Sequence, residues 1–219
     1  MPKEPAPPPD HTRATTYLRK ACPSMKALVT RIGPCTMEIG STRTPFQALV
    51  SAVAHQQLHG KAAATILGRS RLLFPNGRFP SPKALAGVSD DQLRGVGFSR
   101  AKTAALRDLA EKSLAGVVPS IKVIRELSDE EIIARLTQVR GIGKWTVEML
   151  LIFTLGRPDI WPVDDFGVRT GWKIAYGLPE MPSPKELQAL GERFRPHRSI
   201  AAWYLWRATD VNRSPENGA

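Results

Sequence analysis

The stretch Leu136-Thr-Gln-Val-Arg-Gly-Ile-Gly-Lys-Trp-Thr-Val-Glu-Met149 decides the fold. Apolar residues at helical spacing lie on both sides of Gly141-Ile142-Gly143, where the spacing breaks. Glycine permits a positive φ and leaves the backbone bare for close approach to another group. The sequence therefore predicts two helices joined by a tight turn over residues 130–151, with Ile142 anchoring the turn in the core.

This glycine turn also predicts an anion site. The N–H groups at the start of the second helix point outward, and the helix dipole favours negative charge there. Lys144 adds a positive charge at the same terminus. An ordinary turn between two helices that happens to contain two glycines fits the same spacing. The basic balance of the whole chain favours the anion site.

The charge of the chain points to a polyanionic partner. Lys and Arg number 31 against 20 Asp and Glu, which gives a net charge of +11. A surplus of this size bears on binding partners rather than on fold. A generally basic proteome is the alternative explanation, and charge alone does not separate DNA from RNA or from an anionic membrane surface.

Composition excludes several other classes. No stretch approaches the roughly 20 apolar residues that a membrane helix needs, so no membrane partner is expected. The polar, proline-rich start of the chain reads as a disordered tail rather than a secretory signal. Two cysteines are too few for a disulfide framework or an iron–sulfur cluster, and the four histidines lack zinc-ligand spacing. This cysteine and histidine content fits a protein of a reducing intracellular compartment that has no transition-metal cofactor.

Helical signals continue along the chain. The apolar residues Phe46, Leu49, Val50, Val53 and Ala54 recur on one helical face. Helix starts are marked by the capping-box pairs Ser89/Gln92, Ser128/Glu131 and Ser183/Glu186 and by Pro82 and Pro184. A further helix is expected over Phe166–Tyr176. Because long alternating strand patterns are absent, the sequence predicts an all-α protein with ten or more helices.

One short internal echo supports this organisation. Leu93-Arg-Gly-Val-Gly97 repeats the pattern of Val139-Arg-Gly-Ile-Gly143. Both segments place two glycines around one apolar residue between predicted helices. The echo is too short for a solenoid, and it predicts two hairpins of similar build.

Together with Asp159-Ile-Trp-Pro-Val-Asp-Asp-Phe166, the first stretch resembles the helix-hairpin-helix plus Gly/Pro/Asp signature of base-excision DNA glycosylases, nearest the DNA-3-methyladenine glycosylase II and yeast-type branch. The resemblance runs from about Pro45 to about Asp210. It implies two helical lobes with an active-site cleft between them. Residues 46–158 would form a central lobe that contains the hairpin, residues 13–45 and 159–212 a terminal lobe, and residues 1–12 and 213–219 tails.

The resemblance also implies the activity. A monofunctional enzyme would hydrolyse the N-glycosidic bond of alkylated purines of the 3-methyladenine and 7-methylguanine type in double-stranded DNA. It would act as a monomer in the cytoplasm or nucleoid, or in a eukaryotic nucleus. In bifunctional relatives the position after the Gly-x-Gly-basic element carries a lysine that attacks the sugar. Here that position is Trp145, so no lyase activity is expected.

Asp165 is the candidate catalytic residue. An aspartate at a helix start is more often an N-cap, and the resemblance assigns catalysis to Asp165 and leaves the cap to Asp164. A carboxylate stabilises the positive charge that develops on the sugar, and it can orient or deprotonate the attacking water. An alkylated purine already carries a positive charge and leaves with little acid assistance, so one carboxylate suffices.

Tryptophans are the candidates for the base pocket. The resemblance places Trp145 and Trp206 there, with Trp161 as a further candidate. An indole attracts a cationic base by about 0.5–2 kcal/mol. Taken alone, any one tryptophan is more typical of a core, and Trp203 gains nothing from the resemblance.

The polar segment 54–61 resembles the loop that fills the DNA stack when a base is extracted. Gln57 or Leu58 is the candidate plug, and His59 would reach the minor groove. A solvated turn is the alternative. The candidate phosphate contacts are Lys61, Arg100, Lys102, Arg140 and Lys144, each of which is also typical of a solvated charge.

The hairpin itself supplies the remaining DNA contacts that the resemblance implies. These are Gly141, Ile142, Gly143, Lys144 and Thr146. In the family the backbone carbonyls of such a hairpin can hold a monovalent cation, here those of Thr137, Val139 and Ile142. No other cofactor is expected.

Three rival interpretations remain at this point. The chain could be a non-catalytic hairpin module that binds DNA, although Asp165 and the aromatic residues argue against it. It could be a glycosylase for another lesion, such as a deaminated or etheno base. An RNA-binding helical protein would share the charge but has no use for the carboxylate.

Overall fold

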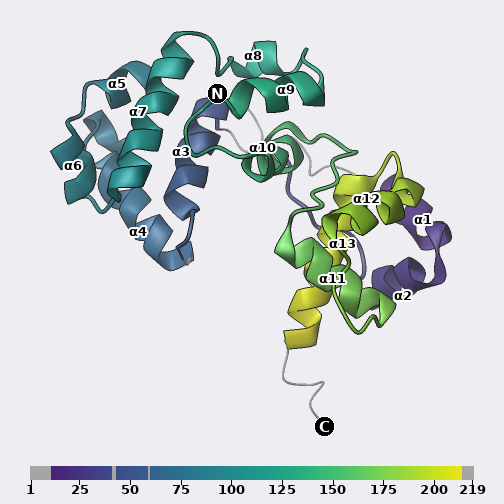
Figure 1. The fold of residues 1–219 in the computed structure, drawn as a ribbon. Helices are drawn as coiled ribbons and strands as arrows, with labels where there is room; N and C mark the ends of the chain where they lie inside the picture. The colour runs from purple at the N-terminus through teal and green to yellow at the C-terminus, as the bar shows by residue number, and fades with distance from the viewer. Residues whose placement is uncertain (1–10, 41–42, 59, 214–219) are drawn as a thin grey trace, which may run out of the picture. The chain divides into compact units, whose positions relative to one another are not determined.

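The computed structural model describes residues 11–40, 43–58 and 60–213 (Figure 1). These residues form helices joined by turns and loops, and none of them lies in a strand. The predicted all-α class is confirmed. The expected tails fall mostly outside the described residues, as does His59, but Thr12 already begins a helix and Arg213 ends one. Within the described ranges no helix is both long and apolar enough to cross a membrane.

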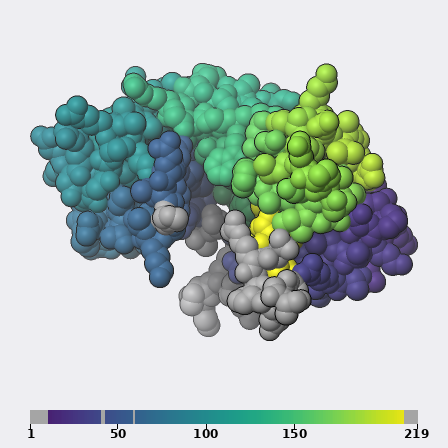
Figure 2. Space-filling model, turned by 60° about the horizontal axis from the view of Figure 1, so that its bottom comes forward, coloured from purple at the N-terminus to yellow at the C-terminus, as the bar shows by residue number. Residues whose placement is uncertain are grey.

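The chain divides into two compact units, residues 1–39 with 156–219 and residues 40–155. We call them the terminal unit and the central unit. The helices of the terminal unit are α1 (Thr12–Ala21), α2 (Pro23–Ile32), α11 (Phe166–Tyr176), α12 (Pro184–Gly191), the short η3 (Glu192–Phe194) and α13 (Arg198–Arg213). Those of the central unit are α3 (Pro45–His55), α4 (Gly60–Arg71), η1 (Pro75–Gly77), α5 (Pro82–Ala86), α6 (Asp90–Gly95), α7 (Arg100–Leu114), α8 (Ile121–Ile124), α9 (Asp129–Leu136), α10 (Lys144–Leu150) and η2 (Leu151–Leu155). Figure 2 shows one face of the molecule with every atom drawn.

Local signals set most helix starts. All three predicted capping boxes form, at α6, α9 and α12, each with the serine side chain and the residue at the third helical position bonded reciprocally. Pro82 and Pro184 occupy the first turn of α5 and α12, as predicted. The predicted helix over Phe166–Tyr176 is confirmed as α11.

The core of the central unit lies between α3, α7, α9 and α10. Every apolar residue predicted for the inner face of α3 is buried, and Leu49, Val53 and Ala54 have no exposed area. Leu106 and Leu109 of α7 are equally inaccessible, as are Leu136 of α9 and Val147 of α10. This packing holds the two hairpin helices, α9 and α10, against the rest of the unit.

The terminal unit is built around the pair α11 and α13. Gly171 allows their backbones to meet, because a β-carbon there would lie only 2.0 Å from the carbonyl oxygen of Leu205. Trp172 of α11 and Tyr204 of α13 are fully buried beside this contact. The close approach brings the start of α11 next to the middle of α13.

The loop that precedes α11 is fastened to the start of α13. Arg198 binds Asp159 through its Nε at 2.8 Å and its Nη2 at 3.0 Å. Ser199 Oγ accepts a hydrogen bond from the N–H of Ile160 and donates one to the carbonyl of Arg157. These contacts fix the segment that leads to Asp165.

The two similar sequence segments, residues 93–97 and 139–143, do not adopt the same backbone conformation. In the hairpin, Gly141 has φ +75° and Ile142 is buried. In the earlier segment the positive φ belongs to the second glycine, Gly97 at +113°, while Val96 is half-buried and Phe98 is the residue that packs inward. Both segments do join two helices, α6 to α7 and α9 to α10, but the two turns differ in detail, because the positive-φ position shifts and a different residue anchors the turn.

Candidate active site

Asp165 occupies the N-cap of α11. Its Oδ1 accepts a hydrogen bond from the N–H of Val168 at 2.8 Å and another from Nε1 of Trp206 at 2.8 Å. The side chain lies largely inside the protein, with the residue 7% exposed. A carboxylate that has lost its water needs such donors in exchange, and the helix N-terminus adds a favourable dipole. The result is an anion held in one orientation.

The prediction that Asp164 caps this helix is wrong. The cap must be the residue directly before the first helical one, and α11 begins at Phe166. Asp164 instead lies exposed in the preceding turn. One carboxylate, that of Asp165, therefore both starts the helix and forms the candidate catalytic group.

Gly167 gives the indole of Trp206 room to reach Asp165. A β-carbon at Gly167 would lie 2.8 Å from Cδ1 of Trp206 and 3.1 Å from Oδ1 of Asp165. Those separations are shorter than ordinary carbon contacts of about 3.5–4.0 Å. Gly167 and Gly171 stand one helical turn apart on the face of α11 that meets α13, so both small residues serve the same close approach.

Sequence reasoning missed two residues beside Asp165. Phe166 exposes 65% of its surface at the first position of α11, an unusual place for a large apolar side chain. Gly167 was also missed, although the spacing Gly167-x-x-x-Gly171 signals a helix face that another element approaches closely. The neighbourhood of the carboxylate thus consists of an exposed phenyl ring, a half-buried indole and a helix start.

The three predicted pocket tryptophans lie in different settings. Trp145 is 45% exposed on α10 of the central unit, and Trp206 is half-buried beside Asp165 in the terminal unit. Trp161 is a core residue, 5% exposed, with its Nε1 bonded to the carbonyl of Leu187 at 2.8 Å. It packs edge-on against Trp172 and Phe194. Its assignment to the base pocket is wrong, because it lies inside the core, and its polar atom already has a partner there.

The predicted hairpin forms between α9 and α10. Gly141 takes a positive φ of +75°, which explains the first glycine, whereas Gly143 has an ordinary φ of −91° and serves as the N-cap of α10. Ile142 is 3% exposed and anchors the turn as predicted. Since Gly143 has no side chain, no side-chain cap accepts the first N–H groups of α10. Those donors suit an oxyanion.

Helix α7 braces this hairpin from the side. Oδ2 of Asp108 accepts the backbone N–H of Arg140 at 2.6 Å and the Nζ of Lys112 at 3.0 Å. Lys112 also donates to the carbonyl of Gln138. Burial raises the pKa of Asp108, but the hydrogen bonds and charges of Arg140 and Lys112 outweigh it and hold that pKa below its ordinary value of 3.8.

The predicted DNA contacts on α10 differ in accessibility. Lys144 is exposed and lies 3.5 Å from Oε1 of the buried Glu148. The side chains of Ile142 and Thr146 are buried, so these two residues offer their backbone rather than their side chains to a partner. Gly141 and Gly143 are exposed.

The polar turn after α3 lies against the hairpin. Gln56 donates from Nε2 to the carbonyl of Gly141 at 2.8 Å. Gln57 has a left-handed φ of +55°, which is uncommon for a residue other than glycine, and Leu58 is 39% exposed. Both candidate plug residues are therefore at the surface.

The candidate phosphate contacts are not alike. Lys61, Arg100 and Arg140 are exposed, as predicted for cations that meet DNA. Lys102 instead donates its Nζ to the carbonyl of Ala54 at 2.8 Å, and burial lowers its pKa. This bond ties the ammonium group to the end of α3, and the role of Lys102 as a phosphate contact stays a prediction.

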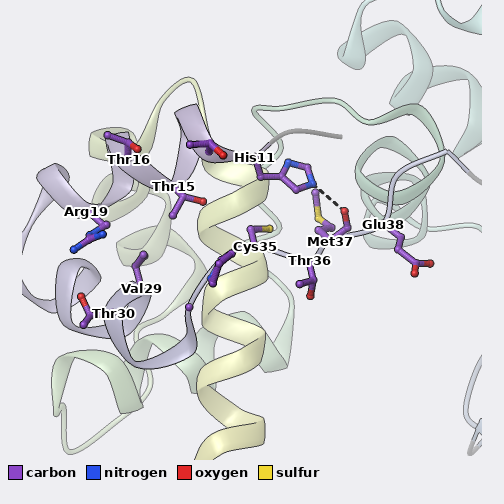
Figure 3. A pocket seen from close by; sticks show the side chains of 13 residues that line it. His11, Thr15, Thr16, Arg19, Val29, Thr30, Cys35, Thr36, Met37 and Glu38 are labelled. Carbon is purple, nitrogen blue, oxygen red and sulfur yellow. Dashed lines mark hydrogen bonds between the residues drawn. The ribbon is translucent and has the colours of Figure 1, made fainter. Parts of the chain in front are cut away.

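A cavity of about 870 Å³ lies elsewhere in the terminal unit, between α1, α2 and the segment after α2 (Figure 3). His11 hydrogen-bonds the carbonyl of Met37 at its rim through Nε2. The cavity is lined by none of the candidate site residues. Burial raises the pKa of its thiol, Cys35, to about 11, so that thiol stays protonated at neutral pH.

In the described part of the chain, no cluster of three or more His, Cys, Asp or Glu side chains could hold a metal ion. The hairpin carbonyls proposed for a monovalent cation are oxygen donors of suitable hardness. That of Val139 already accepts the N–H of Ile142 at 3.0 Å, which leaves it one further lone pair.

Known proteins resemble this chain over most of its length. Residues 50–196 match the HhH-GPD superfamily of base excision DNA repair proteins. DNA-3-methyladenine glycosylase 1 of Schizosaccharomyces pombe is 39% identical over 204 residues, 91% of this chain and 88% of that protein. A structure of the 3-methyladenine DNA glycosylase Mag1 of the same yeast with abasic DNA is 38% identical, with a TM-score of 0.83 over 91% of this chain and 97% of that one. The DNA-3-methyladenine glycosidase of Bacillus halodurans is 30% identical, with a TM-score of 0.82 over 95% of each chain.

Proposed function

The chain belongs to the HhH-GPD superfamily of base excision DNA repair proteins, and on that premise we propose that it is a monofunctional DNA glycosylase for alkylated purines. It hydrolyses the N-glycosidic bond of bases of the 3-methyladenine and 7-methylguanine type in double-stranded DNA. The observation that carries the proposal is the buried Asp165 carboxylate at the start of α11, which two hydrogen-bond donors hold in one orientation. The likeness to two glycosylase structures over at least 91% of the chain supports it.

Asp165 is the catalytic residue in this proposal. As the base leaves, positive charge builds on the sugar, and the oriented carboxylate stabilises it without reorganisation. Such preorganised groups contribute about 10²–10³ in rate. Water completes the hydrolysis. Because Oδ1 is held by Val168 and Trp206, the plane of the carboxylate is set before substrate arrives.

The absence of a nucleophilic amine after the hairpin makes the enzyme monofunctional. Trp145 stands where the bifunctional relatives carry lysine. Its neighbour Lys144 is exposed and paired with Glu148 at 3.5 Å, and in this proposal it faces the DNA backbone rather than the sugar. No step through a covalent sugar adduct follows.

Two indoles supply the affinity for the cationic base. Trp145 is exposed on α10, and Trp206 is half-buried beside the carboxylate. A cation over an indole face gains about 0.5–2 kcal/mol, more as water is excluded. An alkylated purine carries that positive charge and an undamaged purine does not, so the attraction favours the damaged base.

The central unit provides the grip on DNA. Backbone N–H groups at Gly143 and the start of α10 hold a phosphate, and the exposed Lys144 and Lys61 are further phosphate contacts. The hairpin carbonyls of Thr137, Val139 and Ile142 hold a monovalent cation. Gln57 or Leu58 fills the vacated stack. The exposure of both side chains supports that role. The protein acts as a monomer in the compartment that holds the chromosome.

A base-release assay tests the proposal. Purified protein is incubated with duplex DNA methylated by an alkylating agent, and the released bases are quantified by chromatography, with an uracil-containing duplex in parallel. We expect release of methylated purines by the wild type and a loss of at least about 100-fold in Asp165→Asn. Equal release by the two proteins contradicts the role of Asp165. A borohydride-trapped adduct on abasic DNA contradicts the monofunctional assignment.

A further inference from the structure

The turn after α3 has a backbone that its own sequence does not favour. The chain leaves the helix at Gln56, and Gln57 then adopts a left-handed φ of +55°. Residues with a side chain adopt this conformation only where the surroundings enforce it. Within the turn, the N–H of Leu58 bonds the carbonyl of His55 at 3.2 Å. This bond does not involve Gln57 itself, so we look to contacts outside the turn for what holds the left-handed conformation.

Two side-chain hydrogen bonds link the end of α3 and its turn to distant segments. Nζ of Lys102, on the first turn of α7, donates to the carbonyl of Ala54 at 2.8 Å. Nε2 of Gln56 donates to the carbonyl of Gly141 at 2.8 Å, joining residues 85 positions apart. The first bond satisfies a carbonyl that the end of α3 leaves without a helical partner. The second ties the turn directly to the hairpin.

The hairpin end of this bond is itself rigid. Gly141 sits at the positive-φ position of the turn, and the next residue, Ile142, is buried and bonds the carbonyl of Val139. The preceding residue, Arg140, gives its backbone N–H to Asp108 of α7. Gln56 thus connects the polar turn to a backbone that three other contacts hold in place.

We propose that Gln56 is a positioning residue that holds the plug of the turn at a fixed spacing from the phosphate-binding backbone of the hairpin. The proposal rests on the proposed function, in which the hairpin grips a phosphate and Gln57 or Leu58 enters the stack. A plug on a tethered turn enters at one nucleotide step relative to the gripped phosphate. Without the tether the turn samples other positions, and insertion carries an ordering cost.

The test uses Gln56→Met, which keeps the length of the side chain and removes its N–H donor. Gln188→Met is the matched control, because it removes an exposed amide from α12 of the other unit, where the amide bonds only Glu192. Both variants are compared with the wild type by thermal unfolding. Both are expected to unfold close to the wild type, since each loses one bond at the surface.

Insertion is measured separately from excision. The probes are two duplexes, one undamaged and one with a stable abasic analogue opposite 2-aminopurine, whose fluorescence reports unstacking. We expect Gln56→Met to bind the abasic duplex about three- to tenfold more weakly, the range of one hydrogen bond. We also expect it to lose the fluorescence change while its affinity for undamaged duplex stays within about twofold. Gln188→Met should match the wild type in all three measurements.

A variant that lacks both candidate plug side chains shows whether Gln56 acts through the turn. In the double variant Gln57→Ala/Leu58→Ala, adding Gln56→Met should change abasic binding by less than about twofold, because no plug remains to be positioned. An equal loss in both backgrounds overturns the proposal, as does wild-type behaviour of Gln56→Met. Failure of the proposed function looks different, since the wild type would then not prefer the abasic duplex at all.

Discussion

Gly167→Ala tests whether the room beside Asp165 matters for chemistry. The added β-carbon would lie 2.8 Å from Trp206 Cδ1, so the indole has to move by several tenths of an ångström and its bond to Asp165 breaks. A hydrogen bond to a charged group contributes about 1.5–3 kcal/mol. At 1.36 kcal/mol per factor of ten, the excision rate should fall about 10- to 100-fold. Alanine is the better helix former by about 1 kcal/mol, which limits the loss of stability to about 1–2 kcal/mol.

A second glycine provides the matched control. A β-carbon at Gly191 would lie 2.2 Å from Nε1 of Trp161, an indole in the same unit whose partner is the carbonyl of Leu187 rather than Asp165. Gly191→Ala should therefore lose stability by overpacking, about 1–3 kcal/mol, and keep its rate at temperatures where it is folded. Single-turnover excision of methylated purine, measured well below both unfolding midpoints, compares the two. Equal rates for Gly167→Ala and Gly191→Ala would refute the reasoning.

Three further outcomes follow from other contacts. Asp165→Asn should keep the stability of α11, because asparagine caps a helix as well as aspartate, whereas Asp165→Ala should lose about 1 kcal/mol of unfolding free energy in addition to activity. Asp108→Asn should destabilise the protein by about 1–2 kcal/mol at pH 7. The Asp108 pKa is lowered in the folded state, so its contribution is present above pH 3.8 and is lost as the pH falls further. Urea unfolding of the wild type and Asp108→Asn is measured at pH 7 and at the lowest pH where both fold. The difference in their unfolding free energies should shrink at the lower pH, and a constant difference contradicts the role of Asp108. Arg198→Met leaves Asp159 without its main partner and should lower the unfolding free energy by about 3 kcal/mol, seen as a drop of about 6–12 °C in the unfolding midpoint. Arg195→Met, which removes the more exposed partner of Asp159, is the control. A smaller drop for Arg198→Met than for Arg195→Met would contradict the importance of the buried pair.

The helical framework could be predicted because its signals are local. A serine followed three residues later by glutamate or glutamine determines a helix start within one turn, as at Ser128 and Ser183. The same holds for Ile142, whose burial follows from the two glycines that flank it. The family resemblance then assigned a function to Asp165, which local spacing alone would have described as a cap.

The contacts that could not be predicted join residues that are far apart in the chain. The bond from Trp206 to Asp165 spans 41 residues, and the bond from Gln56 to Gly141 spans 85. Nothing in the pattern around Trp161 distinguishes a core indole from a pocket indole, since both need an apolar setting. Asp164 differs for another reason, because the single carboxylate of Asp165 both caps α11 and forms the candidate catalytic group, so the structure needs no second aspartate for the cap.

The double duty of Asp165 has a consequence for how this enzyme can lose its activity over evolutionary time. A lineage that no longer needs excision is still selected to keep α11 folded. Replacements that remove the cap are therefore purged, and those that preserve it, asparagine above all, drift in freely. Relatives that bind DNA without cutting the glycosidic bond should thus carry a neutral capping residue at this position, and that residue identifies them in a sequence alone.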